Sequence, residues 1–404
     1  MTASTEVRPP QLDSADLAEA IAEIADDAKR RREAGGGRPE RAVRLIRQLR
    51  LGAVRIPTDA GGGGYSKREL FSLIIRLAEA DPDVPHIIRV HYGFVEERWR
   101  LRHVEQGTPW LSEIISGRLF AGAGSELSGH AIGTHKFDAT LRRDGTGYRI
   151  TGRKFYCTGS LYADYLRISA TDEADQPVSA VIPVDRPGVV HADDWDGIGQ
   201  RETGSGTTIL EDVRIEPGEL LPRHHWGDRT NQPGGSQPQL VLHAIATGIL
   251  RSIVSDAAEL VRSRARTYSW AGADQPRHDP QLLQIIGEIS AAAFIGEAAV
   301  LAAADGQQRS AEHYFQHTDI DPELEHEASL LAAQTKVVVE GIALRAASDL
   351  YGVGGASAVR ESTHLDRHWR NLRTLFSHNP TAYKARAIGD YVVNGASLPT
   401  VGFF

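Results

Sequence analysis

The sequence has a single cysteine, Cys157, among its 404 residues. One cysteine excludes an intrachain disulfide, and it excludes a zinc site built from several thiolates of one chain. The chain also lacks a phosphate loop with a Gly-Lys-Ser/Thr end. We see no stretch that approaches the apolar length of a membrane span, and the first residues, "MTASTEVRPPQLDSADLAEA", lack the apolar core of a signal peptide. We therefore expect a cytoplasmic protein with no membrane partner.

Basic residues are also fewer than acidic residues. There are 45 lysines and arginines against 53 aspartates and glutamates, which gives a formal charge of -8. This balance argues against nucleic acid as the main partner. Hydrophobic residues make up 41% of the chain and charged residues 24%, as in ordinary globular proteins. The length allows two or three domains with a large core, so the chain is long enough for a large enzyme.

The first third of the chain has a helical pattern. In "SKRELFSLIIRLAEAD" the apolar residues recur with the helical period, so that Leu70 and Ile74 share one face. Ser66 and Glu69 have the spacing of a capping box at the start of this segment. We predict an N-terminal α-helical domain over residues 1–116.

The pattern then changes to strands and returns to helices. Short alternating runs broken by glycine, such as "YLRISAT", "VSAVIPV" and "TTILEDVRI", predict strands, and Asp144-Gly145 stands where a hairpin turn is expected. A polar connector rich in proline and glycine, "PRHHWGDRTNQPGGSQPQ", precedes a final helical third that begins near Leu240. The prediction is an α+β fold with a middle β domain over residues 117–222 and a C-terminal α-helical bundle domain over residues 223–404.

Two glycine-rich stretches and one histidine pair do not fit the cofactor or metal motifs that they suggest. "AGGGGYS" lacks the preceding strand of a dinucleotide fingerprint, and "GIGQRETGSGTT" precedes a strand instead of a helix. His364 and His368 have the spacing of a zinc-binding helix, but they lack the intervening glutamate and lie among arginines. We expect no metal.

Two loops carry polar groups that a flat ligand could use. In "GRKFYCTGSLYADY" the hydroxyls of Thr158 and Ser160 flank Gly159, where a ligand can approach the backbone closely. In "FAGAGSELSGH" small residues surround Ser125 and Glu126 in a predicted loop. The plainer interpretation of these segments is an exposed strand end and a glycine-rich connection, and the residues alone do not decide.

Two histidines stand apart from the others. His91 lies in a predicted helix with apolar neighbours, in "RVHYGFVEERW". His378 follows the arginine-rich run "HLDRHWRNLRT" and precedes Asn379-Pro380. An imidazole can donate, accept or shuttle a proton near neutral pH, which suits a catalytic role. A lone histidine in such a place is more often a hydrogen-bonded core residue, so both interpretations remain open.

Five segments in order carry a family resemblance over essentially the whole chain: "KFYCTGS", "DDWDGIGQRETGSGTT", "RSRARTYSW", "LYGVGGASAVRES" and "RNLRTLFSHNPTAYKARAIGDYVVNG". The sequence resembles the acyl-CoA dehydrogenase superfamily, and in particular the class D flavin-dependent monooxygenases of the dibenzothiophene and alkylsulfone branch. The resemblance implies an N-terminal helical domain, a middle β-barrel and a C-terminal four-helix bundle that enclose a flavin. It also implies a homotetramer in which neighbouring chains complete each site.

The resemblance separates two chemistries. Dehydrogenases of this superfamily remove a proton with a carboxylate that, in many members, follows an arginine-rich helix. Here "LFSHNP" occupies that place, with no carboxylate between Arg370 and Asp390. The monooxygenases instead react reduced flavin with dioxygen to give a C4a-hydroperoxide, which a histidine is suited to assist. The resemblance therefore implies oxygenation of a small or aromatic molecule, with sulfur as the first candidate for the oxidised atom. The alternatives are oxidation at nitrogen or aromatic carbon, acyl-CoA dehydrogenation, and a flavin-binding scaffold without activity.

The cofactor is expected to be FMN, with FAD as the second choice. Nothing in the chain resembles a nicotinamide site, so a separate NAD(P)H-dependent reductase should supply the reduced flavin. The resemblance assigns catalytic roles to His91, His378 and Thr158, with His378 as the leading candidate. It assigns flavin contacts to Ser125, Tyr156, Thr158, Trp195, Arg266, Gly354, Gly355 and Ser357, the last three toward the phosphate of an adjacent subunit. One departure is Leu375, where some sulfur-oxidising relatives have a second histidine.

Overall fold

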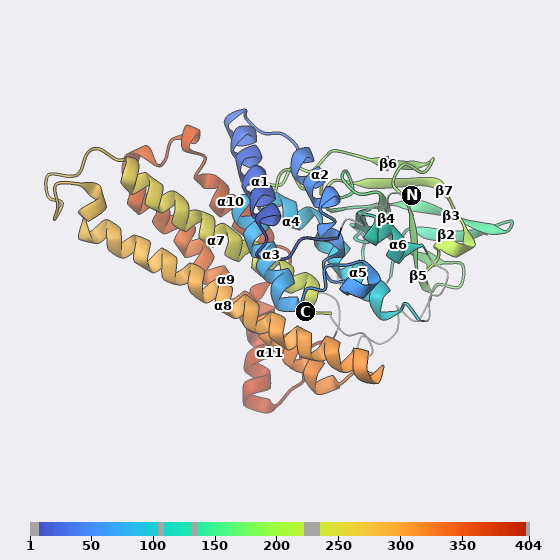
Figure 1. Ribbon diagram of the computed structural model, residues 1–404. Helices are drawn as coiled ribbons and strands as arrows, with labels where there is room; N and C mark the ends of the chain where they lie inside the picture. Colours follow the sequence, from blue (N-terminus) through green and yellow to red (C-terminus); the bar gives the residue numbers. More distant parts are fainter. Residues whose placement is uncertain (1–7, 104–108, 131–135, 222–234, 401–404) are drawn as a thin grey trace, which may run out of the picture.

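The structure is a computed structural model that describes residues 8–103, 109–130, 136–221 and 235–400. Helices come first (Figure 1): α1 (Ala15–Glu33), α2 (Glu40–Gln48), η1 (Leu51–Ala53), η2 (Thr58–Ala60), α3 (Lys67–Ala80), α4 (Asp83–Ile87), α5 (Arg89–Arg100) and α6 (Trp110–Ile115). The strands follow: β1 (Phe120–Ala123), β2 (Thr140–Asp144), β3 (Gly147–Lys154), β4 (Tyr165–Asp172), β5 (Pro177–Pro183), β6 (Val189–His191) and β7 (Thr208–Ile215), and then η3 (Pro217–Glu219). The last part is helical again: α7 (Gln237–Ser263), η6 (Pro276–His278), α8 (Pro280–His317), α9 (Pro322–Gly354), η7 (Gly355–Ser357), η8 (Glu361–Thr363), α10 (Asp366–Phe376) and α11 (Thr381–Asn394). Most of the predicted connector before α7 lies outside the described residues.

Helix α3 forms where the local sequence predicts it. The Ser66 side chain accepts a hydrogen bond from the Glu69 amide, and the Glu69 carboxylate accepts one from the Ser66 amide, so the predicted capping box is confirmed. Leu70, Ile74 and Leu77 share the buried face of the helix, as their spacing predicts.

The strands form one mixed sheet in the order β1-β4-β2-β3-β7-β6, with β5 paired to β4. β1 and β2 run parallel to β4, and the other pairs are antiparallel. The predicted hairpin between β2 and β3 is confirmed, with Asp144 opposite Gly147 and a turn at Gly145, whose φ is 58°. Among the described strands, no pairing joins β5 to β6, and the closure of this sheet into a β-barrel stays a prediction.

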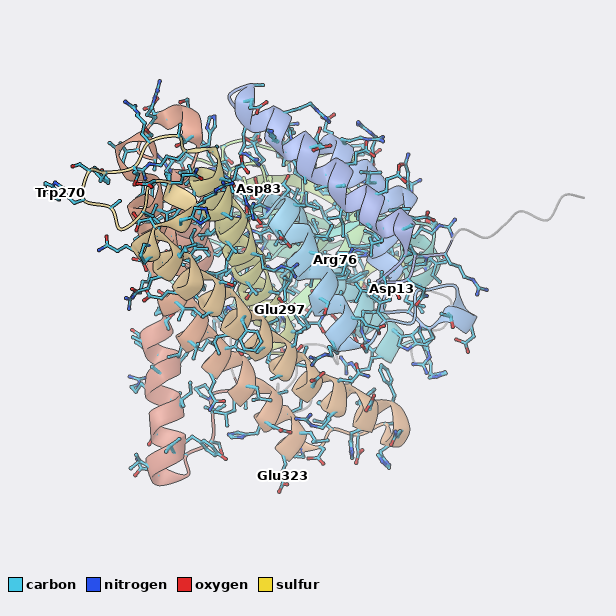
Figure 2. All side chains as sticks on the ribbon, turned by 60° about the vertical axis from the view of Figure 1, so that its left-hand side comes forward. Asp13, Arg76, Asp83, Trp270, Glu297 and Glu323 are labelled. Atoms are coloured by element: carbon cyan, nitrogen blue, oxygen red, sulfur yellow. The ribbon has the colours of Figure 1, made fainter. Side chains whose placement is uncertain are left out.

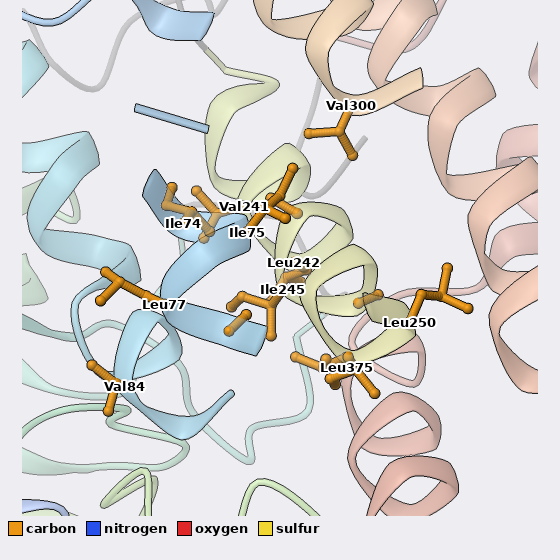
Figure 3. Close-up of a cluster of buried hydrophobic side chains, with 14 of the residues drawn as sticks. Ile74, Ile75, Leu77, Val84, Val241, Leu242, Ile245, Leu250, Val300 and Leu375 are labelled. Atoms are coloured by element: carbon orange, nitrogen blue, oxygen red, sulfur yellow. The ribbon is translucent and has the colours of Figure 1, made fainter. Parts of the chain in front are cut away.

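The N-terminal and C-terminal helices share one hydrophobic core, although the sheet separates them in sequence. Figure 3 shows Ile74 and Ile75 of α3 facing Val241 and Ile245 of α7, with Val300 of α8 beside them. The sheet has a second, smaller core of its own. Figure 1 shows the sheet on one side of the long helices α7, α8 and α9. The first and last thirds of the chain therefore pack as one helical body.

Two described helices, α7 and α8, are long and apolar enough to cross a membrane by length and composition alone. The expectation that no stretch approaches that length was therefore wrong, because alanine, isoleucine and glycine keep both helices apolar with few charges. In α7, 72% of the apolar window is buried, as in the core helix of a globular protein. In α8 only 22% is buried, so this helix leaves apolar side chains on the outside.

Candidate functional site

Thr158 lies in the turn after β3, where a chain of buried hydroxyls supports it. Its Oγ1 is 2.8 Å from Oγ of Ser205, which is 2.7 Å from Oγ1 of Thr203. Thr203 in turn donates to the carbonyl of Gln200 at 2.8 Å. The glycine-rich segment before β7 therefore positions the Thr158 side chain and fixes its orientation.

Gly159 allows this turn to lie directly on the end of α4. Its φ is 83°, and a Cβ atom there would come within 2.3 Å of the carbonyl oxygen of Ile87. Both the backbone conformation and the close contact require glycine. The turn that carries Thr158 is thus locked between the sheet and the helices.

Three predicted flavin contacts lie nearer the surface. The Tyr156 side chain is 57% exposed, and its ring meets that of Trp195 edge-on with centroids 6.1 Å apart. Trp195 donates from Nε1 to the carbonyl of Gln200 at 2.9 Å, so the same loop holds it. Ser125 is exposed, and its carbonyl accepts a hydrogen bond from Phe155 at 2.9 Å. Tyr156 has a φ of 57°, an uncommon conformation for a residue other than glycine.

His378 lies in the break between α10 and α11, next to Arg89 at the start of α5. Nη2 of Arg89 is 3.3 Å from Nε2 of His378. Because a guanidinium can only donate, Nε2 of His378 accepts and the ring proton is on Nδ1. Burial and the charge of Arg89 hold the pKa of His378 well below its usual range, so the ring is neutral at neutral pH.

Further basic side chains, none of them singled out from the sequence, lie around His378. His86 of α4, Lys336 of α9 and His243 of α7 all act on its charge. His86 Nδ1 is 2.9 Å from the side-chain oxygen of Gln200, which links this cluster to the loop behind Thr158. His243 and Lys336 interrupt apolar helical runs, "QLVLHAIATGIL" and "TKVVVEG", and such interruptions were the signal that could have found them.

His91 faces a different part of the molecule. It is fully buried against β1, where its Nδ1 accepts a hydrogen bond from the amide of Phe120 at 3.2 Å. Burial lowers its pKa to about 4. The structure brings Arg89 to His378, whereas His91 packs on the sheet side of the same helix. This placement favours a core histidine, and its catalytic role stays a prediction.

Arg266 and the Gly354–Ser357 loop lie together at the far end of the long helices. Arg264 joins them, because it donates to the carbonyl of Val353 at 3.3 Å and to that of Arg266 at 2.9 Å. Along α7, His243 and Ser263 are about 30 Å apart. Figure 2 shows Trp270 of the same loop standing away from the body of the molecule. Within one chain, Arg266 is therefore remote from His378.

A concavity of about 490 Å³ lies between the loop before β7 and helices α9 and α10. It is lined by Ile198 of the loop before β7, Tyr351 of α9, and Trp369 and Arg370 of α10. The volume is within the range of small-molecule sites. Sequence reasoning did not identify it, because its walls come from three separate parts of the chain.

The residues in these places fit a flavin. Tyr156 and Trp195 offer aromatic surface, Thr158 a hydroxyl, and Gly159 a backbone without a side chain. Among the described residues, no group of three or more histidine, cysteine, aspartate or glutamate side chains is arranged to hold a metal ion. His368 instead lies 2.7 Å from Oδ2 of Asp256 through its Nε2.

Comparisons with known proteins agree on one family. Residues 240–383 match the acyl-CoA dehydrogenase C-terminal domain. A dibenzothiophene monooxygenase from Rhodococcus qingshengii is 29% identical, with 92% of this chain and 91% of that protein covered. The FMN-bound structure of TdsC from Paenibacillus sp. A11-2 has a TM-score of 0.87 at 28% identity, covering 97% and 99% of the two chains. The methanesulfinate monooxygenase MsuC from Pseudomonas fluorescens has a TM-score of 0.82 at 26% identity, covering 96% and 98%. These matches confirm the acyl-CoA dehydrogenase-like fold and the resemblance to flavin-dependent monooxygenases, since over nearly its whole length the chain is similar to dibenzothiophene monooxygenase.

Proposed function

We propose that the protein is a two-component monooxygenase that receives reduced FMN from a separate reductase and oxygenates a small or aromatic substrate at sulfur. FMN and sulfur are supported by the similar proteins, since TdsC was solved with FMN and the relatives include dibenzothiophene and methanesulfinate monooxygenases. The observation that carries the proposal is the neutral His378 held by Arg89, in the place where a dehydrogenase would need a carboxylate.

The chain's own residues have separate tasks in this reaction. Thr158, Tyr156 and Trp195 would hold the flavin ring. A reduced flavin bound there would supply the two electrons with which one atom of dioxygen enters the substrate and the other leaves as water. Arg89 keeps the lone pair of Nε2 of His378 occupied, which leaves the proton on Nδ1 as the one that this residue can give or exchange.

The dehydrogenase alternative lacks a suitable base in this cluster. Glu340 of α9 is the carboxylate that lies by Lys336, at 3.8 Å. It already accepts hydrogen bonds from Arg373 at 3.2 Å and from Thr381. Each of its two oxygens therefore already faces a donor of the chain, Oε1 that of Arg373 and Oε2 that of Thr381, instead of a substrate. His378 is therefore the better candidate for proton exchange.

Other parts of the proposal rest on sequence and family. The separate reductase follows from the absence of a nicotinamide fingerprint in the sequence. We also propose a cytoplasmic homotetramer. In that assembly the flavin phosphate bound by one chain is reached by four residues of a neighbouring chain, namely Arg266, Gly354, Gly355 and Ser357. This arrangement accounts for the distance between these residues and His378 within one chain.

Labelled dioxygen tests the function directly. The protein is incubated with FMN, a flavin reductase and NADH, together with an organic sulfide or sulfinate, and the product is analysed by mass spectrometry. We expect one labelled oxygen atom on sulfur in each product molecule. Label on nitrogen or aromatic carbon would identify another monooxygenase. Bleaching of the bound flavin by an acyl-CoA without oxygen would identify a dehydrogenase. If the protein bound no flavin at all, the scaffold without activity would be the remaining interpretation.

A further inference from the structure

One residue of the segment before β7, Gln200, is fully buried and connects several parts of the predicted flavin site. Its backbone carbonyl accepts hydrogen bonds from Nε1 of Trp195 at 2.9 Å and from Oγ1 of Thr203 at 2.8 Å. Trp195 is a predicted flavin contact, and Thr203 begins the chain of hydroxyls that ends at Thr158. The position of this one peptide group therefore sets the positions of two predicted flavin contacts.

Helix α10 holds the backbone of Gln200 in an uncommon conformation. Its φ is 51°, in the left-handed region that residues other than glycine rarely adopt. The Gln200 amide donates to Oδ1 of Asn371 at 2.7 Å. A Cβ atom on the preceding Gly199 would lie 2.2 Å from the carbonyl oxygen of Arg370, so the loop lies directly on the helix. Such a conformation persists only where the surrounding contacts over-determine it, and conformations of this kind cluster at functional sites.

The side chain of Gln200 extends toward α4. Its Oε1 is 2.9 Å from Nδ1 of His86, and because an amide oxygen can only accept, His86 donates from Nδ1. Burial and the charge of Arg89 lower the pKa of His86 to about 3, so the ring is neutral and Nε2 carries the lone pair. The next residue of α4, Ile87, is the one whose carbonyl lies against the Gly159 position. Two consecutive residues of α4 thus support both turns of the predicted flavin site.

Among the described residues, the contact with His86 is the one hydrogen bond that the Gln200 side chain makes. Its Nε2 is shielded from solvent and has no partner there. An apolar side chain of the same size would fill this volume without leaving a donor unmatched. Space filling therefore does not explain a glutamine at this position, whereas the connection between the loop and α4 does.

We propose that Gln200 is a positioning residue of the flavin site, which fixes Trp195 and Thr158 relative to α4 through its side-chain hydrogen bond with His86. This inference rests on the part of the proposed function in which the protein binds FMN. Because Gln200 is fully buried, it acts through the residues that it holds and not by contact with the substrate. Loss of the hydrogen bond with His86 frees the loop to shift, so that the flavin ring is held less firmly.

Fluorescence titration of FMN into the purified protein tests this connection. Gln200→Leu and His86→Leu each remove one partner of the hydrogen bond and keep an apolar side chain. We expect both single variants and the double variant to bind FMN about 3- to 10-fold more weakly, the range for one hydrogen bond, with no further loss in the double variant. The visible circular dichroism of the bound flavin should change alike in all three, because it reports on the surroundings of the ring. Gln176→Leu, at an exposed position between β4 and β5, is the matched control and should leave both measurements unchanged.

Two outcomes would overturn the inference. Additive losses of FMN affinity in the double variant would show that Gln200 and His86 act separately. A lower melting temperature of Gln200→Leu, with FMN affinity and flavin dichroism as in the unmodified protein, would show that Gln200 only stabilises the fold.

Failure of the proposed function has a different signature, because the unmodified protein would then bind no FMN. The connection between Gln200 and His86 is in that case tested by urea unfolding of the same four proteins without flavin. Losses of stability that add in the double variant would refute it, and losses that do not add would support it.

Discussion

At the scale of single residues, the protonation state of His378 decides how the site works. Burial and the neighbouring basic groups keep its imidazole neutral, and the contact with Arg89 fixes the tautomer. Removing the ring in His378→Ala should reduce substrate oxidation by about 10²- to 10⁴-fold, the usual contribution of general acid-base catalysis. FMN affinity should stay nearly the same, because the helix break at Asn379-Pro380 follows from proline geometry.

Product and hydrogen peroxide are measured per reduced flavin, with a melting curve on the same sample. Continued oxygen consumption with peroxide release and little product is the expected pattern. A destabilised variant that still couples each flavin to product would show that His378 only packs the end of α10.

Several buried histidines make the stability of the protein depend on pH. Burial lowers the pKa of His86 to about 3 and those of His91 and His368 to about 4. In the unfolded chain each has a pKa of about 6.5. Between pH 6.5 and 4 the unfolded state binds more protons, so stability falls as the pH falls through this window. Each such histidine contributes a slope of about 1 kcal/mol per pH unit. Urea unfolding at a series of pH values measures the slope.

His91→Gln separates packing from chemistry at this position. Glutamine keeps an acceptor for the amide of Phe120 but does not titrate. We expect a shallower fall in stability below pH 6.5 and turnover per folded molecule within about twofold, since a core residue acts on the fold alone. A large loss of turnover with an unchanged pH slope would restore the catalytic role that the sequence suggested.

At the scale of elements, the turn after β3 connects the sheet to the flavin site. Gly159→Ala adds a Cβ atom 2.3 Å from the carbonyl oxygen of Ile87 at a positive φ. Gly145→Ala, in the β2–β3 turn, also has a positive φ but meets nothing within 4 Å. The control should lose about 1–2 kcal/mol from left-handed strain alone. Gly159→Ala should lose more and weaken FMN binding, because the turn carries Thr158.

Thermal unfolding and flavin titration on both variants check this expectation. Equal losses in stability with unchanged FMN affinity would mean that the Thr158 turn adjusts freely and does not position the cofactor.

The elements also show which features a sequence can reveal. The capping box at Ser66 and Glu69 and the hairpin at Asp144-Gly145 were predictable, because each depends on residues close together in the chain. The grouping of His86, Arg89, His243 and Lys336 around His378 was not, because four helices bring these residues together and each looks alone like an unusual core residue. The resemblance supplied His378, but it gave no reason to connect that residue with His243.

At the scale of the whole molecule, helix α8 leaves an apolar face uncovered. Leu283, Phe294 and Ile295 are 50%, 70% and 46% exposed. Large exposed apolar side chains on one long helix favour a contact with another surface. We expect a second copy of the chain to cover it in a homotetramer. Phe294→Glu should shift the mass measured by light scattering toward smaller species, whereas a flavin-competent monomer of the unmodified protein would contradict the tetramer.

Mixed oligomers test whether neighbouring chains share each site. Arg266 is exposed and lies about 30 Å along α7 from the level of His243, so a flavin beside His378 can reach it only in another copy. Arg266→Ala alone should weaken FMN binding, because a guanidinium on phosphate makes charge-assisted contacts that alanine cannot replace. When Arg266→Ala and His378→Ala chains are co-expressed, a site that takes His378 from one chain and Arg266 from its neighbour is intact in about one quarter of random pairings. Activity near that fraction, from two variants that are each nearly inactive, is the expected result. If Arg266 and His378 instead served the same site within one chain, every site would carry one defect and co-expression would restore nothing.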